Sequence, residues 1–191
     1  MTALAFFGVT IISMLVTVFA FSTNPELSEW FKSLMQNERS YIAIPPPYTG
    51  DLYFFILLNN VGHFWNPIRM LVWVPLLGTF ALGFELLLNS VLIGALSVVV
   101  GVTKGVFYPI LGIVPHGVIE IPAFILEFAS IIRWHVAIIE AIMDKITGER
   151  VKVAEFKQGV KDSLILTVIS ATLFIIAAFI ETYITPRLLR I

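Results

Sequence analysis

The sequence contains no cysteine and few charged residues. Of its 191 residues none is Cys, and only 13% are Asp, Glu, Lys or Arg, against about 25% in an average soluble domain. The lack of cysteine excludes a disulfide scaffold, a cysteine nucleophile, a Cys-ligated zinc site and an iron–sulfur cluster. The net charge of −1 provides no basic surface for nucleic acid, and the composition is not that of a disordered chain.

Apolar residues dominate what remains. They make up 58% of the chain, and the mean hydropathy is +0.93. A soluble fold of this size cannot hide so much apolar surface from water. Most charges fall in three short segments, 22–51, 144–162 and 187–191, separated by long runs nearly free of charge. This pattern is typical of an all-α, polytopic membrane protein, and we interpret residues 1–191 as a single membrane domain.

The apolar runs predict about five transmembrane helices. A single helix over residues 70–103 would reach about 51 Å and exceed a bilayer core of about 30 Å. We therefore expect a break near Gly83–Asn89, which puts Glu85 at a turn close to the cytoplasmic surface. Residues 105–117 contain two prolines and three glycines, and predict a broken or re-entrant segment. The predicted spans are 3–21, 68–84, 88–103, 118–142 and 163–185.

The first connecting segment, 22–50, is predicted to leave the membrane as an amphipathic helix followed by a Pro-rich strut. Five basic residues in 144–162, against two in 22–51, place 144–162 in the cytoplasm by the positive-inside rule. The segment 22–50 and the C-terminus are then extracytoplasmic and the N-terminus cytoplasmic, in a multi-pass protein of the cell membrane. The apolar stripe of the helix consists of Leu27, Trp30, Phe31, Leu34 and Met35.

His116 and Glu120 form the densest ionisable pair in the apolar part of the chain. Their i, i+4 spacing puts them on one face if both are helical. One interpretation is a pair that handles protons or binds a metal at a helix start. The other makes Gly117 an N-cap, with Glu120 on the free N–H groups of the first turn. Two candidate ligands and no His-Glu-x-x-His motif argue against zinc, so we expect no metal and no cofactor.

Four further polar side chains are candidates for the membrane interior. Glu127 follows Glu120 by seven residues, on the same face and about 10 Å away. These two carboxylates either line an ion path or join a structural cluster. We expect Asn59 and Asn60 to hydrogen-bond the broken backbone of residues 105–117. Glu181 is expected to be interfacial or to pair with another polar group within the bundle. The full set, a buried polar cluster or an ion path, is Asn59, Asn60, His116, Glu120, Glu127 and Glu181.

Small residues recur along one predicted helix at spacings of three and four. Such a stripe allows a second helix to approach closely within a membrane. We predict helix packing at Ser90, Gly94, Ser97 and Gly101.

Several short strings of residues in the sequence carry a resemblance to a known family. They are Asn59-Asn60, Asn89 with Gly94, the run Val114-Pro115-His116-Gly117-Val118-Ile119-Glu120-Ile121-Pro122-Ala123, and Ala178-Phe179-Ile180-Glu181 before Thr185-Pro186. Over residues 50–187 the chain resembles the stage II sporulation protein M family of integral membrane proteins. The resemblance implies about five membrane helices and, by analogy with the namesake, a membrane anchor that gathers other proteins. The family usually has small residues after Pro-Ala; here Glu127 and Phe128 stand there, so Glu127 is interpreted as a local specialisation.

Two functions follow as expectations. The first is a non-enzymatic membrane scaffold that docks membrane or extracytoplasmic proteins, with the lipid bilayer as its other partner and no nucleic acid. The second is a small ion channel or transporter, in which a homo-oligomer lines a path with the intramembrane His and Glu residues. No nucleophile elbow, phosphate loop or catalytic triad is present in the sequence, so we expect no enzyme.

Overall fold

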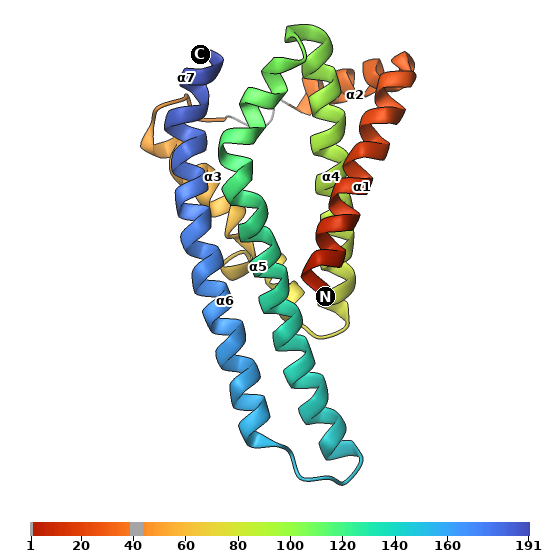
Figure 1. The fold of residues 1–191 in the computed structure, drawn as a ribbon, viewed down its shortest axis with the longest axis vertical. Coiled ribbons are helices and arrows are strands. Elements are labelled where there is room, and N and C mark those ends of the chain that lie inside the picture. The colour runs from red at the N-terminus through yellow and green to blue at the C-terminus, as the bar shows by residue number, and fades with distance from the viewer. Residues whose placement is uncertain (1, 39–43) are drawn as a thin grey trace.

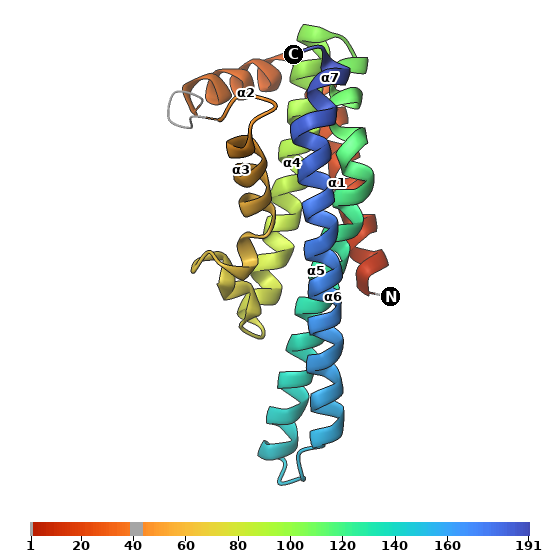
Figure 2. The ribbon, with the colours of Figure 1, turned by 90° about the vertical axis from the view of Figure 1, so that its left-hand side faces the viewer.

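The structure, a computed structural model, describes residues 2–38 and 44–191, and all regular structure in these ranges is helical. Figures 1 and 2 show the path of the chain. The helix α1 (Thr2–Thr23) leads to the short helix α2 (Pro25–Glu38), and the chain then returns through α3 (Gly50–Asn60) and two 3₁₀ turns. The turns are η1 (Gly62–Phe64) and η2 (Arg69–Trp73).

Three long helices form the rest of the molecule. They are α4 (Leu77–Lys104), α5 (Phe107–Ile146) and α6 (Val153–Phe179), and α6 continues through a π-helical turn, η3 (Ile180–Ile184), into α7 (Thr185–Leu189). The helices α5 and α6 run side by side and extend well beyond the other elements, while α1 packs along α4 (Figures 1 and 2).

The membrane character follows from helix length and composition. Within the described ranges, three helical stretches are long and apolar enough to span a bilayer: 77–104, 107–146 and 153–189. The bent pair of α1 and α2, which meet at 106°, makes a fourth candidate. The expected count of about five is not confirmed.

The predicted breaks are in the wrong places. Residues 107–146 form one continuous helix that includes Pro115 and Pro122, so no re-entrant turn forms at 105–117. A proline inside a helix removes one N–H donor, but in membrane helices neighbouring helices and local adjustments compensate for it. The expected break at Gly83–Asn89 is also absent, because α4 is continuous there. Glu85 therefore lies inside a long helix and not at a cytoplasmic turn.

The chain breaks earlier, between α3 and α4. Two prolines, Pro67 and Pro75, interrupt residues 61–76, and Leu76 has a positive φ of 66°. Gly78, in the first turn of α4, lies directly against the carbonyl oxygen of Val72, where a Cβ atom would overlap that oxygen. This close approach folds the 3₁₀ segment back onto the first turn of α4.

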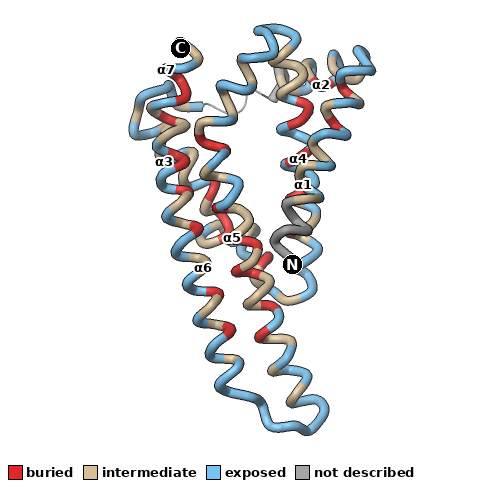
Figure 3. Tube along the Cα trace, viewed as in Figure 1, coloured by how far each residue is buried: buried red, intermediate tan, exposed pale blue. Residues whose placement is uncertain are grey.

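Buried residues follow the helix contacts, and the outer surfaces are exposed and apolar (Figure 3). Between α5 and α6 the contact is made by small polar groups: Ser130 Oγ lies 2.8 Å from the carbonyl oxygen of Ser163, and Ser170 donates to the carbonyl of Ala123 over the same distance. Phe124 and Phe174 meet edge to face at 4.8 Å. Small-residue contacts of this kind are characteristic of helix association in lipid.

The predicted packing stripe on α4 is used in part. Ser90 and Gly94 are buried, and a Cβ atom on Gly94 would lie 3.0 Å from the Met14 carbonyl oxygen of α1. Ser97 is half-buried and donates to the Ile93 carbonyl of its own helix. A Cβ on Gly101 would make only ordinary contacts with residues just beyond the end of the helix, the Pro109 ring at 3.7 Å and the Val106 Cα at 3.9 Å.

The apolar stripe of α2 divides between two environments. Phe31 is buried edge to face against Phe21 of α1, with ring centroids 5.5 Å apart, and packs with Ala95 of α4. Leu27 and Met35 join this group, whereas Trp30 and Leu34 are exposed. The C-terminal residue lies at the same end, since its carbonyl accepts a hydrogen bond from the Tyr48 hydroxyl at 2.9 Å. The 147–152 loop lies at the opposite end (Figure 1).

Candidate functional site: two buried polar clusters

The first group, here called the His63 cluster, contains His63, Arg69, Glu85 and Glu127. The His63 ring lies between two carboxylates: its Nε2 is 2.6 Å from Glu85 Oε2 and its Nδ1 is 3.0 Å from Glu127 Oε1. The side chains of His63 and Glu127 are fully buried. The ring thus bridges the 3₁₀ segment to both α4 and α5.

Arg69 completes the charge balance of this cluster. Its Nη2 donates to Glu85 Oε1 at 2.8 Å, and its Nη1 donates to the carbonyl of Asn59. A Cβ atom on Gly62 would overlap the guanidinium, so glycine allows this contact. A protonated His63 between two ionised carboxylates, or a neutral His63 with a protonated Glu127, gives zero net charge with Arg69. The charges of the cluster are therefore compensated, as those of a buried ionic group must be.

Side chains of η2 and α5 satisfy the backbone of the broken segment. Trp73 Nε1 donates to the carbonyl of His63, and Trp134 Nε1 donates to the carbonyl of Trp73, both at 2.9 Å. His135 Nε2 lies 2.8 Å from the Val72 carbonyl oxygen. Non-helical backbone within a membrane protein needs such partners. The prediction that broken backbone needs polar partners holds, but the backbone is that of residues 63–73 and not 105–117, and the partners are Trp and His side chains and not those of Asn59 and Asn60.

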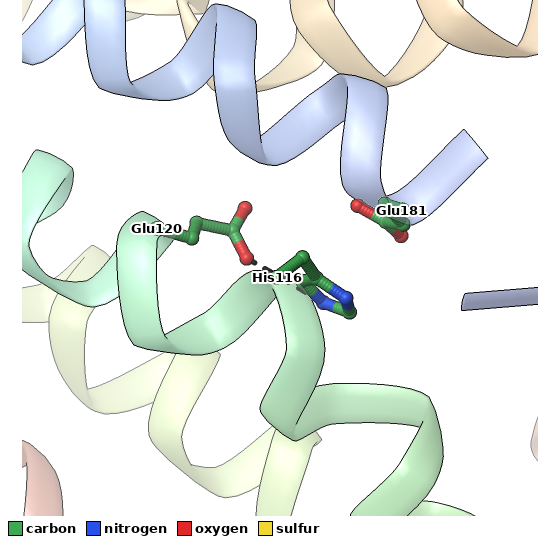
Figure 4. A group of neighbouring side chains, drawn as sticks. All are labelled: His116, Glu120 and Glu181. Carbon is green, nitrogen blue, oxygen red and sulfur yellow. Dashed lines mark ion pairs between the residues drawn. The ribbon is translucent and has the colours of Figure 1, made fainter. Parts of the chain in front are cut away.

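The second group, the His116 cluster, contains Asn60, His116, Glu120 and Glu181. Ligand atoms of His116, Glu120 and Glu181 all lie within 4.8 Å of one another (Figure 4). His116 Nε2 is 3.7 Å from Glu120 Oε2, and Asn60 Nδ2 donates to Glu120 Oε1 at 2.7 Å. These residues come from α5, η3 and α3, and the cluster joins three separate parts of the chain.

The π-helical turn brings Glu181 to this cluster. Residues 180–184 contain one more residue per hydrogen-bonded turn than an α-helix, which rotates the side chains that follow. Isolated π turns of this kind are frequent at functional sites. In the part of the chain that the structure describes, no hydrogen bond holds the Glu181 carboxylate.

The structure thus divides the predicted polar set. Asn60, His116, Glu120 and Glu181 come together, whereas Glu127 belongs to the His63 cluster. The side chain of Asn59 is exposed, and only its carbonyl takes part. The capping interpretation of the His116 pair is wrong, because α5 begins nine residues before His116.

Sequence reasoning missed the partners of Glu127. Neither His63 nor Arg69 was selected, and Glu85 was placed at a surface turn. The available signal was the isolation of Glu85 in an apolar run long enough to span the bilayer. A carboxylate at such depth requires a cationic or hydrogen-bonding partner, and the two nearest candidates in the preceding segment are His63 and Arg69.

Sequence comparison assigns the chain to a family. Residues 3–186 match the family described as Stage II sporulation protein M. The chain belongs to this family. Three of the four strings that carry the stage II sporulation protein M resemblance, those around Asn60, His116 and Glu181, converge in the His116 cluster, although up to 121 residues separate them.

Two archaeal relatives match at lower coverage. Uncharacterized protein MJ0793 of Methanocaldococcus jannaschii is 30% identical over 141 residues, which is 70% of each chain. Uncharacterized protein MJ0706 of the same organism is 28% identical over 126 residues, which is 66% of this chain and 55% of the relative. The match therefore spans little more than half of MJ0706. No solved structure matches the chain.

Proposed function

We propose that the protein is a non-enzymatic membrane scaffold that docks partner proteins on the projecting end of the α5–α6 hairpin. The observation that carries this proposal is the length of α5. At about 1.5 Å per residue, the 40 residues of α5 extend about 60 Å, roughly twice the bilayer core. One end of the hairpin must therefore stand in water, beyond the other helices (Figures 1 and 2).

The surface of this end suits a protein partner. Residues 144–162 carry five basic and four acidic residues. Exposed apolar side chains interrupt these charges, including Met143, Ile146 and Val153. A shallow pocket of about 230 Å³ lies between the helices near Asp144 and Phe156. Apolar side chains surrounded by a polar and charged rim are typical of protein interfaces.

The charge-compensated His63 cluster supports the scaffold over a channel. Its two acids are paired with Arg69 and His63, and paired acids tie helices together instead of offering an uncompensated charge to a passing ion. This is the arrangement expected if the membrane part serves mainly to hold the projecting hairpin in place.

A photocrosslinker placed at Met143 or at Ile146, in cells that make the native protein, tests the scaffold. We expect the same discrete protein adduct from both positions and none from Val102, an even more exposed residue at the other end. The substitution Lys152→Glu, at a residue that lines the pocket, should abolish the adduct; four basic residues then remain in 144–162 to keep the orientation of the hairpin. Adducts that differ between the two positions, or that survive the charge reversal, would contradict docking at this end.

A transporter is the second candidate, because the His116 cluster gathers two carboxylates without an Arg or Lys partner among the described residues. If it is an ion path, Glu120→Gln abolishes ion flux in proteoliposomes and leaves the fold intact. If the cluster is structural, proteoliposomes show no flux above protein-free vesicles. Glu120→Gln is then tolerated better than Glu120→Ala, since Gln still accepts the Asn60 hydrogen bond.

A further inference from the structure

We propose that His116, Glu120 and Glu181 bind one divalent transition-metal ion, of the class of Zn²⁺ or Mn²⁺. The site is distinct from the docking surface of the hairpin and does not depend on it. Three potential ligand atoms, one from each side chain, lie within 4.8 Å of one another (Figure 4).

The spacing is close to that of a ligand set. Ligands at about 2.0–2.2 Å from a tetrahedral metal lie about 3.3–3.6 Å apart. His116 Nε2 and Glu120 Oε2 are already 3.7 Å apart. Because these two residues are one helical turn apart on α5, the helix itself fixes their separation. Only the Glu181 side chain, on a flexible stem, has to move inward to complete the set.

The His116 cluster has an excess of acidic groups that a bound cation would neutralise. Two carboxylates face one imidazole, and no ion pair to Arg or Lys is formed by Glu120 or Glu181 in the described part of the chain. The His63 cluster, by contrast, balances its two carboxylates with Arg69 and His63. Carboxylates at membrane depth are costly without a partner. A divalent cation would neutralise both at once.

The surrounding hydrogen bonds orient the side chains of Glu120 and His116 toward each other. Asn60 holds Oε1 of Glu120, which leaves Oε2 facing His116. The Thr185 hydroxyl lies 3.5 Å from His116 Nδ1, so the ring presents Nε2 to the carboxylate. Partners that hold the non-ligating atoms of His and Glu are typical of metal sites, where they fix the tautomer and the direction of the lone pair.

The donor set selects the class of ion. One imidazole nitrogen with two carboxylate oxygens suits zinc and manganese, whereas calcium and magnesium prefer oxygen ligands alone. The side chains of His116 and Glu120 are 11% and 19% exposed, so neither is fully enclosed by protein. Three protein ligands leave coordination positions open on such an ion.

Metal titration of the full-length chain tests the site directly. The protein, purified in detergent and treated with EDTA, is titrated with Mn²⁺ while the signal of the free ion is followed by electron paramagnetic resonance. Competition with Zn²⁺ is then measured. We expect one ion per chain, displacement by Zn²⁺, and a rise in Tm on binding. Ca²⁺ and Mg²⁺ at the same concentration should displace little Mn²⁺.

Three variants connect the ion to these residues. Glu181→Gln, Glu120→Gln and His116→Gln should each weaken Mn²⁺ binding at least tenfold and remove the rise in Tm. Glu140→Gln, an exposed acid on the same helix, should bind as the native chain does. The Tm of each variant without metal shows whether it is folded, and Glu120→Gln keeps an acceptor for Asn60.

Two results would overturn the proposal. One is the absence of stoichiometric binding to the folded native chain, which would mean that the two carboxylates share a proton in place of a metal. The other is binding that Glu181→Gln and His116→Gln leave unchanged, which would place the ion elsewhere.

Discussion

The Nδ1 atom of His63 lies 3.0 Å from Oε1 of Glu127, and neither side chain reaches the surface. The two residues are 64 positions apart, one in a 3₁₀ turn and the other in the middle of α5. The second oxygen of Glu127 has no hydrogen-bond partner within the described ranges. Within the described ranges, the Glu127 carboxylate therefore has its hydrogen bond from His63 alone. This hydrogen bond fixes the 3₁₀ segment to α5, the longest helix.

A double-mutant cycle on His63 and Glu127 should reveal this dependence. His63→Ala or Glu127→Ala leaves a buried group without its partner, which costs about 3–5 kcal/mol in comparable buried pairs. We expect the double variant to lose less free energy of unfolding than the sum of the singles, with a coupling of about 0.5–3 kcal/mol. Unfolding in mixed detergent micelles measures it, with Glu140→Ala as the control. Additive losses would show that the contact contributes nothing of its own.

Gly94 and Gly83 provide a matched pair of substitutions on α4. A Cβ at Gly94 would lie 3.0 Å from the Met14 carbonyl oxygen and from Thr17 Cβ, whereas a Cβ at Gly83 would meet nothing within 4 Å. Gly94→Ala should therefore destabilise the protein by about 1–3 kcal/mol through overpacking. Gly83→Ala should be neutral or stabilise it by up to about 1 kcal/mol, because Ala favours the helix. Tm in one detergent compares them, and equal shifts would mean that α1 does not pack closely on α4.

The class of the protein could be predicted from sequence because it depends on averages. Few charges and long apolar runs suffice to indicate helices in a membrane, and the first and last spans lie within α1 and the α6–α7 stretch. Helix breaks depend on single residues in context. Pro115 looked like a break and is inside α5, while Pro75 does precede the start of α4. In lipid, neighbouring helices decide whether a proline interrupts the backbone.

Only the pairing of residues close together in the sequence could be predicted for the candidate site. His116 and Glu120 are one turn apart, so their spacing alone pairs them. Glu181 reaches them through a π turn, which no simple period of the sequence reveals. The pairing of His63 with Glu85 and Glu127 joins three elements, and hydropathy contains no information about which polar residues meet.

The exposed residues of α2 should lie at the membrane surface. Leu34 is exposed while Phe31, on the neighbouring face, is buried against α1. A nitroxide on Leu34→Cys should be accessible to oxygen dissolved in lipid, and one on Glu29→Cys, whose side chain is 73% exposed, to a water-soluble nickel reagent. Because the chain has no native cysteine, each label reports one position. Equal access of the nickel reagent to both positions would place α2 away from the bilayer.

The orientation of the protein in the membrane is the last prediction. The segment 144–162 has five basic residues and lies at the opposite end of the molecule from α2 (Figure 1). Basic residues are retained on the cytoplasmic side, so this end should face the cytoplasm and α2 the outside. Single cysteines at Ser33 and Gln158, both exposed, report the two ends separately.

An impermeant maleimide added to intact cells should label Ser33→Cys and leave Gln158→Cys unlabelled until the membrane is permeabilised. The structure alone allows either orientation, because turning the molecule over preserves every internal contact. Only the basic residues distinguish the two. Labelling of Gln158→Cys alone would therefore reverse the orientation and place the projecting hairpin outside the cell, where its docking partners would have to be sought. Labelling of both positions would mean that the two ends do not lie on opposite sides of the membrane.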